Sequence, residues 1–253
     1  PLKGSSVRQA IDESRRILEI ISILGGQWPH SSFMVPGGVV SMPSTNELNR
    51  CTYLLNNFKH WYERQILGCS LERWHAVQTK ADLVSWLKES ESHLKSDLGM
   101  YIRFATRIGL HRIGRGHGNF ISFGMPGLET ESNDRERTWV TPPTAGGFYS
   151  GNRLFPMDQK NITEDVSHSW FSGSDKSCHP YDGQSLPYAT GSEDLRYSWA
   201  KAPRYQGAPA ETGPLAEMVI SANPLFSDCI RTDGPNVFLR ELARLVRAAT
   251  IIP

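Results

Sequence analysis

Residues 25–39 read Gly-Gly-Gln-Trp-Pro-His-Ser-Ser-Phe-Met-Val-Pro-Gly-Gly-Val. The glycine pairs at both ends allow the backbone two tight bends, with apolar side chains and one imidazole between them. Ordering such a loop lowers the conformational entropy of the chain, so we expect its large side chains to be buried against a neighbouring element or a partner chain. These side chains are Trp28, His30, Phe33 and Met34. A structural connection between two helices is the simpler interpretation of the loop taken alone.

The loop joins two predicted amphipathic helices. The first begins at Ser5 or Ser6 and ends at Gly25, with apolar residues recurring about every 3.6 positions. The second begins after Ser44, which forms a predicted capping box with a glutamate three residues later, and it ends at Gly68. The loop therefore lies between two helices whose apolar faces require partners.

Two more helices are predicted after a short turn over residues 70–77. One is capped by Thr79 with Asp82, and the other begins near Ser96. We therefore assign residues 1–123, including the loop at 25–39, to a helical body that resembles a bundle.

Residues 124–195 have a different composition. Proline and glycine are dense there, and short alternating runs at 138–140 and 147–150 predict strands. The glycine-rich run 114–119 precedes a strand pattern and not a helix, so a turn is favoured over a phosphate-binding loop. The predicted fold is mainly α with an α+β lobe, in which 124–195 is a small irregular β region and 196–253 ends in a helix.

Composition excludes several classes of protein. The net charge is +1 over 253 residues, so no basic surface for nucleic acid is expected. No apolar run reaches the roughly 18 residues of a membrane span. Because the chain begins at Pro1 and ends shortly after a strong helix pattern, we expect it to be an internal fragment of a longer protein, with apolar helix faces left uncovered.

Candidate chemical groups are scattered. The four cysteines form no CxxC pair and are expected to be free thiols in a reducing compartment. Pairs such as Cys69 with His75, or Cys178 with His179, have spacings that do not suit one metal ion. Glu164, Asp165 and His168 allow acid–base chemistry. A hydrolase using His117, His168 or His179 is a distant alternative.

Three ordered blocks resemble the large subunit of nickel-iron hydrogenases. The first loop matches the pattern GGxxPHxxxxxxGGV, and residues 161–171 resemble the segment ending in His-Ser-Trp and an aromatic residue. The family does not use that segment for chemistry, so the resemblance implies a structural or interface role for Glu164, Asp165 and His168. Residues 197–216 are similar to YSWxKAPRYxGxPxExGPLA. The residue sequence around the first loop and at residues 65–70 is most similar to that of uptake enzymes of the cyanobacterial type.

The resemblance implies an oxidoreductase that oxidises dihydrogen to protons and electrons at a nickel-iron centre. In the family four cysteines hold this centre, in CxxC pairs that this sequence lacks, so the resemblance implies no catalytic or metal-binding residue in this chain and an inactive isolated fragment. It also implies a small subunit with iron-sulfur clusters as partner. His30, Lys201 and Arg204 are the candidates to face this partner or the surroundings of the centre. A non-catalytic scaffold related to a respiratory-complex subunit is the alternative.

Two further expectations concern surroundings. Arg240, Arg244 and Arg247 on the last predicted helix, capped by Gly234 or Asn236, should repel one another unless acids meet them, and in an intact subunit we expect them to pair with missing segments or with the partner chain. We expect the protein in the cytoplasm, with membrane association through partner subunits, and the periplasmic face is the alternative.

Overall fold

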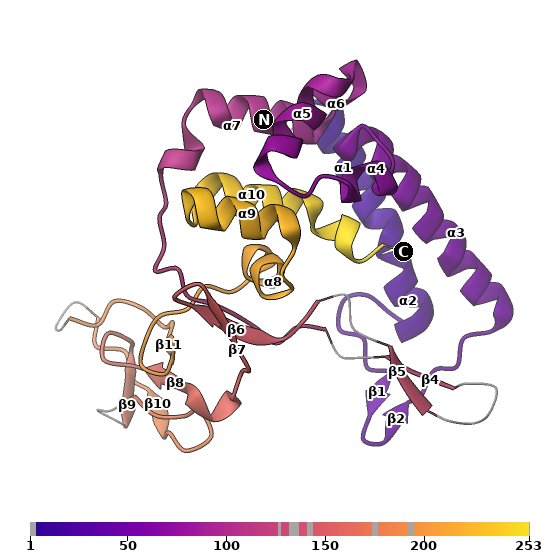
Figure 1. Ribbon diagram of the computed structural model, residues 1–253. Coiled ribbons are helices and arrows are strands. Elements are labelled where there is room, and N and C mark those ends of the chain that lie inside the picture. The colour runs from indigo at the N-terminus through magenta and orange to yellow at the C-terminus, as the bar shows by residue number, and fades with distance from the viewer. Residues whose placement is uncertain are drawn as a thin grey trace. The chain divides into compact units, whose positions relative to one another are not determined.

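The computed structural model describes residues 4–125, 128–131, 137–140, 144–173, 177–191 and 195–252. Contacts divide the chain into two compact units, Pro1–Ile108 with Ile251–Pro253, and Gly109–Thr250 (Figure 1). The three-segment division at 123 and 195 stays a prediction. None of the helices in the described part combines the length and apolar character needed to cross a bilayer.

The first unit is helical apart from one small hairpin. Its elements are α1 (Ser5–Ile17), α2 (Glu19–Gly25), β1 (Met34–Val35), β2 (Gly38–Val39), α3 (Thr45–Trp61), the π-helix η1 (Tyr62–Leu67), α4 (Leu71–His75), α5 (Lys80–Glu89), α6 (Glu91–Lys95) and α7 (Asp97–Arg107). Helix α3 contacts α1, α2 and η1, and α6 contacts α5 and α7. These contacts do not confirm a regular bundle, which stays a prediction.

The predicted first helix is wrong in detail. Gly4 and not a serine is its N-cap, and the helix is interrupted at Leu18, so α1 and α2 are separate. Gly25 is the last helical residue, and Gly26, with φ 80°, takes the left-handed position that the sequence analysis gave to Gly25. Val7, Ile11 and Ile21 are exposed, whereas Ile17 and Leu24 are half-buried, so the apolar faces of α1 and α2 are only partly covered, and the predicted exposed apolar patches stay a prediction.

Side-chain caps define the other helix starts. The capping boxes of Ser44 with Glu47 and of Thr79 with Asp82 are confirmed, and so is the helix start near Ser96, which caps α7. The predicted end at Gly68 is confirmed as the end of η1, which continues α3 beyond Trp61. The predicted turn at 70–77 contains the short helix α4, and α6 was not predicted. Both follow serine caps, at Ser70 and Ser90.

A stack of rings forms the interior of the first unit. Trp86 is fully buried, meets Trp74 edge to face at 5.4 Å between centroids, and stacks on His93 at 4.6 Å. The buried His93 ring is fixed by a 2.7 Å hydrogen bond between its Nδ1 and the Trp86 carbonyl. Helix α5 is thereby held against α4 and α6.

The second unit combines small antiparallel sheets with three α-helices. Its strands are β3 (Phe120–Ser122), β4 (Leu128–Glu131), β5 (Arg137–Val140), β6 (Gly147–Ser150), β7 (Arg153–Phe155), β8 (Ile162–Asp165), β9 (Phe171–Gly173), β10 (Ser185–Pro187) and β11 (Ala202–Tyr205). Its helices are α8 (Pro214–Ile220), α9 (Pro224–Asp233) and α10 (Val237–Val246), with 3-10 turns η2 (Leu110–Arg112), η3 (Gln159–Asn161) and η4 (Arg247–Thr250).

The sheets have the orders β3-β6-β7, β4-β5, β8-β11 and β9-β10. Helix α8 packs on β3, β6 and α10, which places the apolar core of this unit between helices and sheet. The predicted strands at 138–140 and 147–150 and the turn at 114–119 are confirmed.

The C-terminal arginines have partners inside this unit. Asn236 caps α10, as predicted. Arg240 pairs with Glu211, Arg244 with Glu241, and Arg247 with Glu217. Acids therefore meet these charges as the sequence analysis required, and they come from this unit rather than from missing segments or a partner chain.

Candidate functional site

The glycine loop folds back onto the end of α2. Ser31 donates a 2.9 Å hydrogen bond from Oγ to the Gly25 carbonyl, and a Cβ on Gly25 would lie 2.5 Å from the same Oγ. A side chain at Gly25 would therefore displace this hydroxyl and break its hydrogen bond. Strands β1 and β2 then form a hairpin in which Met34 pairs with Val39, and Val40 N–H donates to the Phe33 carbonyl at 2.9 Å.

The side chains of this loop are mostly exposed. Trp28 and Met34 are 53% and 73% accessible, His30 is exposed, and Phe33 is half-buried. Burial against a neighbouring element of this unit is therefore wrong, and burial against a partner chain stays a prediction. His30 has a positive φ of 62° and its carbonyl accepts from the Gln27 side chain, while its ring makes no hydrogen bond to the described residues.

Lys201 directly precedes β11 and is paired within the chain. In the β8–β11 register Pro203 lies opposite Glu164, and Lys201 Nζ reaches Glu164 Oε2 at 2.7 Å. Both side chains are about 30% exposed, and the ammonium lies 5.3 Å from the centroid of Phe171. Glu164 thus holds Lys201, which agrees with the structural role favoured for this carboxylate.

Arg204 is on β11 itself and keeps its charge unpaired. Its guanidinium donates at 2.9 Å to the carbonyl of Pro203, and it forms no ion pair with the described residues. The pKa of Asp165, on the neighbouring strand, is lowered by hydrogen bonds from Ser167 and to a lesser extent by the charge of Arg204. Lys201 therefore directly precedes the strand that carries Arg204, whereas His30 belongs to the other unit.

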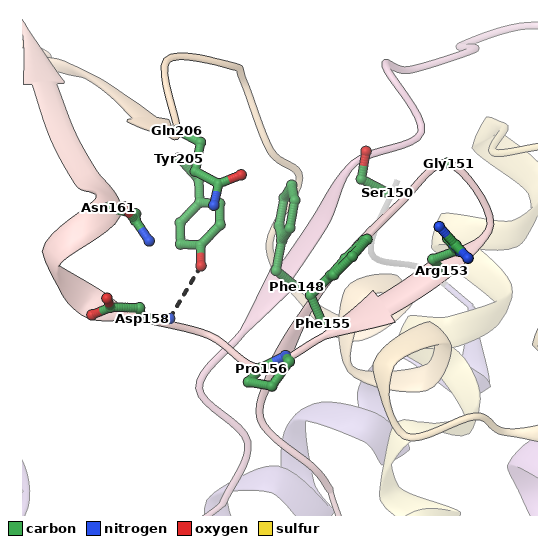
Figure 2. A pocket seen from close by; sticks show the side chains of 10 residues that line it. All are labelled: Phe148, Ser150, Gly151, Arg153, Phe155, Pro156, Asp158, Asn161, Tyr205 and Gln206. Carbon is green, nitrogen blue, oxygen red and sulfur yellow. Dashed lines mark hydrogen bonds between the residues drawn. The ribbon is translucent and has the colours of Figure 1, made fainter.

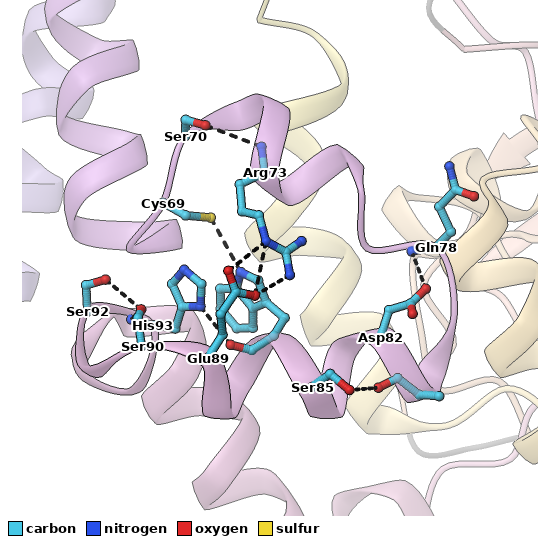
Figure 3. Close-up of polar contacts among 12 residues, drawn as sticks. Cys69, Ser70, Arg73, Gln78, Asp82, Ser85, Glu89, Ser90, Ser92 and His93 are labelled. Atoms are coloured by element: carbon cyan, nitrogen blue, oxygen red, sulfur yellow. Dashed lines mark hydrogen bonds and ion pairs between the residues drawn. The ribbon is translucent and has the colours of Figure 1, made fainter.

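Cys69 is in a setting that disfavours metal binding. Trp86 Nε1 donates to its sulfur at 3.4 Å, and burial raises the pKa of the thiol (Figure 3). His75 is exposed on α4. The neighbouring acid Glu89 is bound by Arg73, and among the described residues no group of three metal-ligating side chains forms at this thiol.

The other candidate groups do not assemble. His179 Nδ1 accepts from Tyr181 N–H at 3.1 Å, and His168 Nδ1 lies 2.9 Å from Ser167 Oγ. In the described part of the chain, no three His, Cys, Asp or Glu side chains converge as metal ligands. These residues do not fit the four-thiolate set that a nickel-iron centre requires.

Two contacts had no signal in the sequence. The Lys201–Glu164 pair joins residues 37 positions apart, and Arg240–Glu211 joins residues 29 apart. Only the strand register and the packing of α10 reveal them.

Comparison with known proteins gives a consistent result. The family model described as nickel-dependent hydrogenase matches residues 8–227. The quinone-reactive Ni/Fe-hydrogenase large chain of Wolinella succinogenes is 26% identical over 231 residues, covering 84% of this chain and 34% of the relative. The uptake hydrogenase large subunit of Rhizobium leguminosarum bv. viciae is 28% identical over 236 residues, covering 84% and 35%. The chain thus spans about a third of the length of these relatives.

Solved structures share the fold. The Ni-Fe-Se hydrogenase of D. vulgaris Hildenborough in the reduced state superposes with a TM-score of 0.65 at 19% identity, over 96% of this chain and 48% of that chain. A reduced, active Ni-Fe-Se hydrogenase of Desulfomicrobium baculatum gives 0.63 at 20% identity, over 96% and 47%.

Proposed function

Because this chain belongs to the nickel-dependent hydrogenase family, we propose that it is part of the large subunit of a nickel-iron uptake hydrogenase, which oxidises dihydrogen to protons and electrons. The observation that carries this proposal is the family match over residues 8–227, which includes the glycine loop, Lys201 and the strand of Arg204. Relatives that are themselves uptake hydrogenase large subunits support the direction of turnover. The cyanobacterial subtype has no support among these relatives and stays a prediction.

The metals are assigned to other parts of the protein. A nickel-iron centre would supply the site at which dihydrogen is split. Among the described residues, the cysteines do not lie together as a metal site, so we assign the ligands of the nickel-iron centre to parts of the protein outside residues 1–253. We assign the iron-sulfur clusters to a small subunit. In this proposal, exposed side chains of this chain bind that small subunit.

The exposed groups of the glycine loop suit a protein interface. Trp28 and Met34 present apolar surface, and the His30 ring has hydrogen-bonding capacity that no described residue uses. On β11, the unpaired Arg204 can donate to backbone carbonyls or carboxylates of a partner. Lys201 has a structural role instead, because its bond to Glu164 on β8 fixes the strand that carries Arg204.

The test uses the complete hydrogenase with a tagged large subunit. His30→Ala and Arg204→Ala should each lower the amount of co-purified small subunit, or the rate of hydrogen-dependent dye reduction, by about tenfold. A loss of this size is expected when a charged or buried hydrogen bond at an interface is removed. Arg115→Gln, on the exposed turn at 114–119, is the matched control and should change neither quantity. Unchanged pairing and activity in both variants would remove the interface assignment.

Two measurements separate the alternatives. A complete native protein that lacks nickel and does not oxidise dihydrogen would point to the non-catalytic scaffold instead. For the compartment, we propose the cytoplasm with attachment through partner subunits, and protease accessibility in spheroplasts distinguishes it from the periplasmic face.

A further inference from the structure

A cavity of about 650 Å³ lies between the β6–β7 hairpin and the β8–β11 pair (Figure 2). In the hairpin register Phe148 lies opposite Phe155, and Ser150 lies opposite Arg153. Residues opposite each other in an antiparallel pair project from the same face. One face of the hairpin therefore presents two phenyl rings and, nearer the turn, a guanidinium.

The aromatic wall of the cavity is built into the core. The rings of Phe148 and Tyr205 lie 4.4 Å apart between centroids, and both residues are buried in a cluster with Ile121. Phe155, 6.4 Å from Phe148, is 43% exposed at the rim. The wall is thus both fixed in position and open to a ligand, and the cavity volume is within the roughly 300–1,000 Å³ of small-molecule sites.

Polar groups lie at opposite ends of this wall. Arg153 forms no ion pair with the described residues, while Asp158 is at the other end, as Figure 2 shows. Tyr205 Oη accepts from Asp158 N–H at 3.1 Å, which leaves its hydroxyl proton to donate. The side-chain amide of Asn161, beside them, makes no hydrogen bond to the described residues. A ligand with its anionic group near Arg153 avoids the carboxylate of Asp158.

We propose that this cavity is a binding site for a small aromatic carboxylate. Its ring lies against Phe148 and Phe155, and its carboxylate pairs with Arg153. The site is independent of the proposed hydrogen chemistry, since it needs neither the metals nor the residues assigned to the interface.

The experiment measures saturation-transfer NMR of two probes, 2-naphthoate and the neutral 2-naphthamide, on the complete purified protein. The native protein should bind the acid about tenfold more tightly than the amide, because the guanidinium recognises only the charged probe. Arg153→Gln should abolish this preference. Phe155→Ala should lower the affinity for both probes about fivefold, because the contact with the phenyl ring is lost.

The control is Leu154→Ala, on the same strand but on its opposite face and exposed, which should change neither affinity. Arg153 is also exposed, so its substitution leaves the fold intact, and a melting temperature equal to that of the native protein verifies this. A preference for the acid that survives Arg153→Gln would overturn the proposal. So would the absence of saturation transfer to the native protein, which would mean that another segment or subunit fills the cavity.

Discussion

Arg240 on α10 and Glu211 before α8 form a two-pronged ion pair. Nε reaches Oε1 at 2.6 Å and Nη2 reaches Oε2 at 2.7 Å, and both side chains are about three-quarters buried. The same guanidinium donates to the Gly114 carbonyl. Glu211 lies in the block that resembles hydrogenase large subunits, so one arginine joins this block, the turn at 114–119 and the last α-helix.

Glu211→Gln should lower the free energy of unfolding by about 1–3 kcal/mol, because Arg240 stays partly buried with only a neutral partner. The bond to Glu211 is the main cause that raises the pKa of Arg240 in the native protein. The variant loses this cause, but a guanidinium is charged at pH 7 without it, so Arg240 keeps its charge. Urea denaturation at pH 7 measures the change.

Arg244→Gln is the matched control for this ion pair. It removes the bond to Glu241, in which the side chains are 62% and 41% exposed, and should change the free energy of unfolding by less than about 0.5 kcal/mol. Equal losses in the two variants would show that burial does not distinguish these pairs.

Glu47 makes the stability of α3 depend on acid. Its carboxylate accepts from Ser44 N–H and Oγ, both at 2.7 Å, and these bonds lower the pKa of Glu47 below 4.5. A lowered pKa in the folded state gives stability that is present above the unfolded pKa and is lost as pH falls through the folded value. Native protein should therefore exceed Glu47→Ala in free energy of unfolding at pH 7, and the difference should shrink towards pH 3. A difference that stays constant over this range would contradict the assignment.

The starts of α3 and α5 were predictable because their determinants are local. Ser44 with Glu47, and Thr79 with Asp82, are three residues apart, so the sequence alone contains both partners of each capping box. The break at Leu18 could not be foreseen in the same way. No proline or glycine marks it, and the apolar period continues across it.

The candidate site was predictable only as separate motifs. The Lys201 block could be recognised from its order of residues, but its bond to Glu164 depends on which residue of β8 faces which residue of β11. Likewise, the buried loop was expected from the cost of ordering Trp28 and Met34, whereas the chain itself leaves both exposed. The Lys201–Glu164 bond depends on pairing between residues far apart in the sequence, and the exposure of the loop depends on which surfaces a partner covers. Neither property leaves a local pattern in the sequence.

Cys69 should be a slow nucleophile. Burial raises the pKa of its thiol, so the thiolate forms at higher pH than in a free cysteine. Alkylation by iodoacetamide, followed by mass spectrometry of the peptide from pH 7 to 10, should show a midpoint above that of glutathione treated in parallel. The pH at the midpoint of the alkylation rate reports the pKa of the thiol. Limited access of the reagent to Cys69 lowers only the maximal rate at high pH. A midpoint at or below that of glutathione would contradict the buried setting.

Gly99 sets two effects of opposite sign against each other. Alanine has a helix propensity about 1 kcal/mol better than glycine, which favours Gly99→Ala inside α7. A Cβ at Gly99 would lie 1.9 Å from the His93 carbonyl oxygen and 2.9 Å from its carbon, and backbone atoms cannot turn away as a flexible side chain would. We expect the close contact to exceed the propensity gain and to lower the free energy of unfolding by about 1–3 kcal/mol.

Ser85→Ala, at an exposed position of α5, isolates the propensity term and should be neutral or slightly stabilising. Urea denaturation compares the two variants. If Gly99→Ala were as stable as the native protein, α6 and α7 would have to separate at little cost, and the buried stack of His93 on Trp86 would then not depend on their close approach.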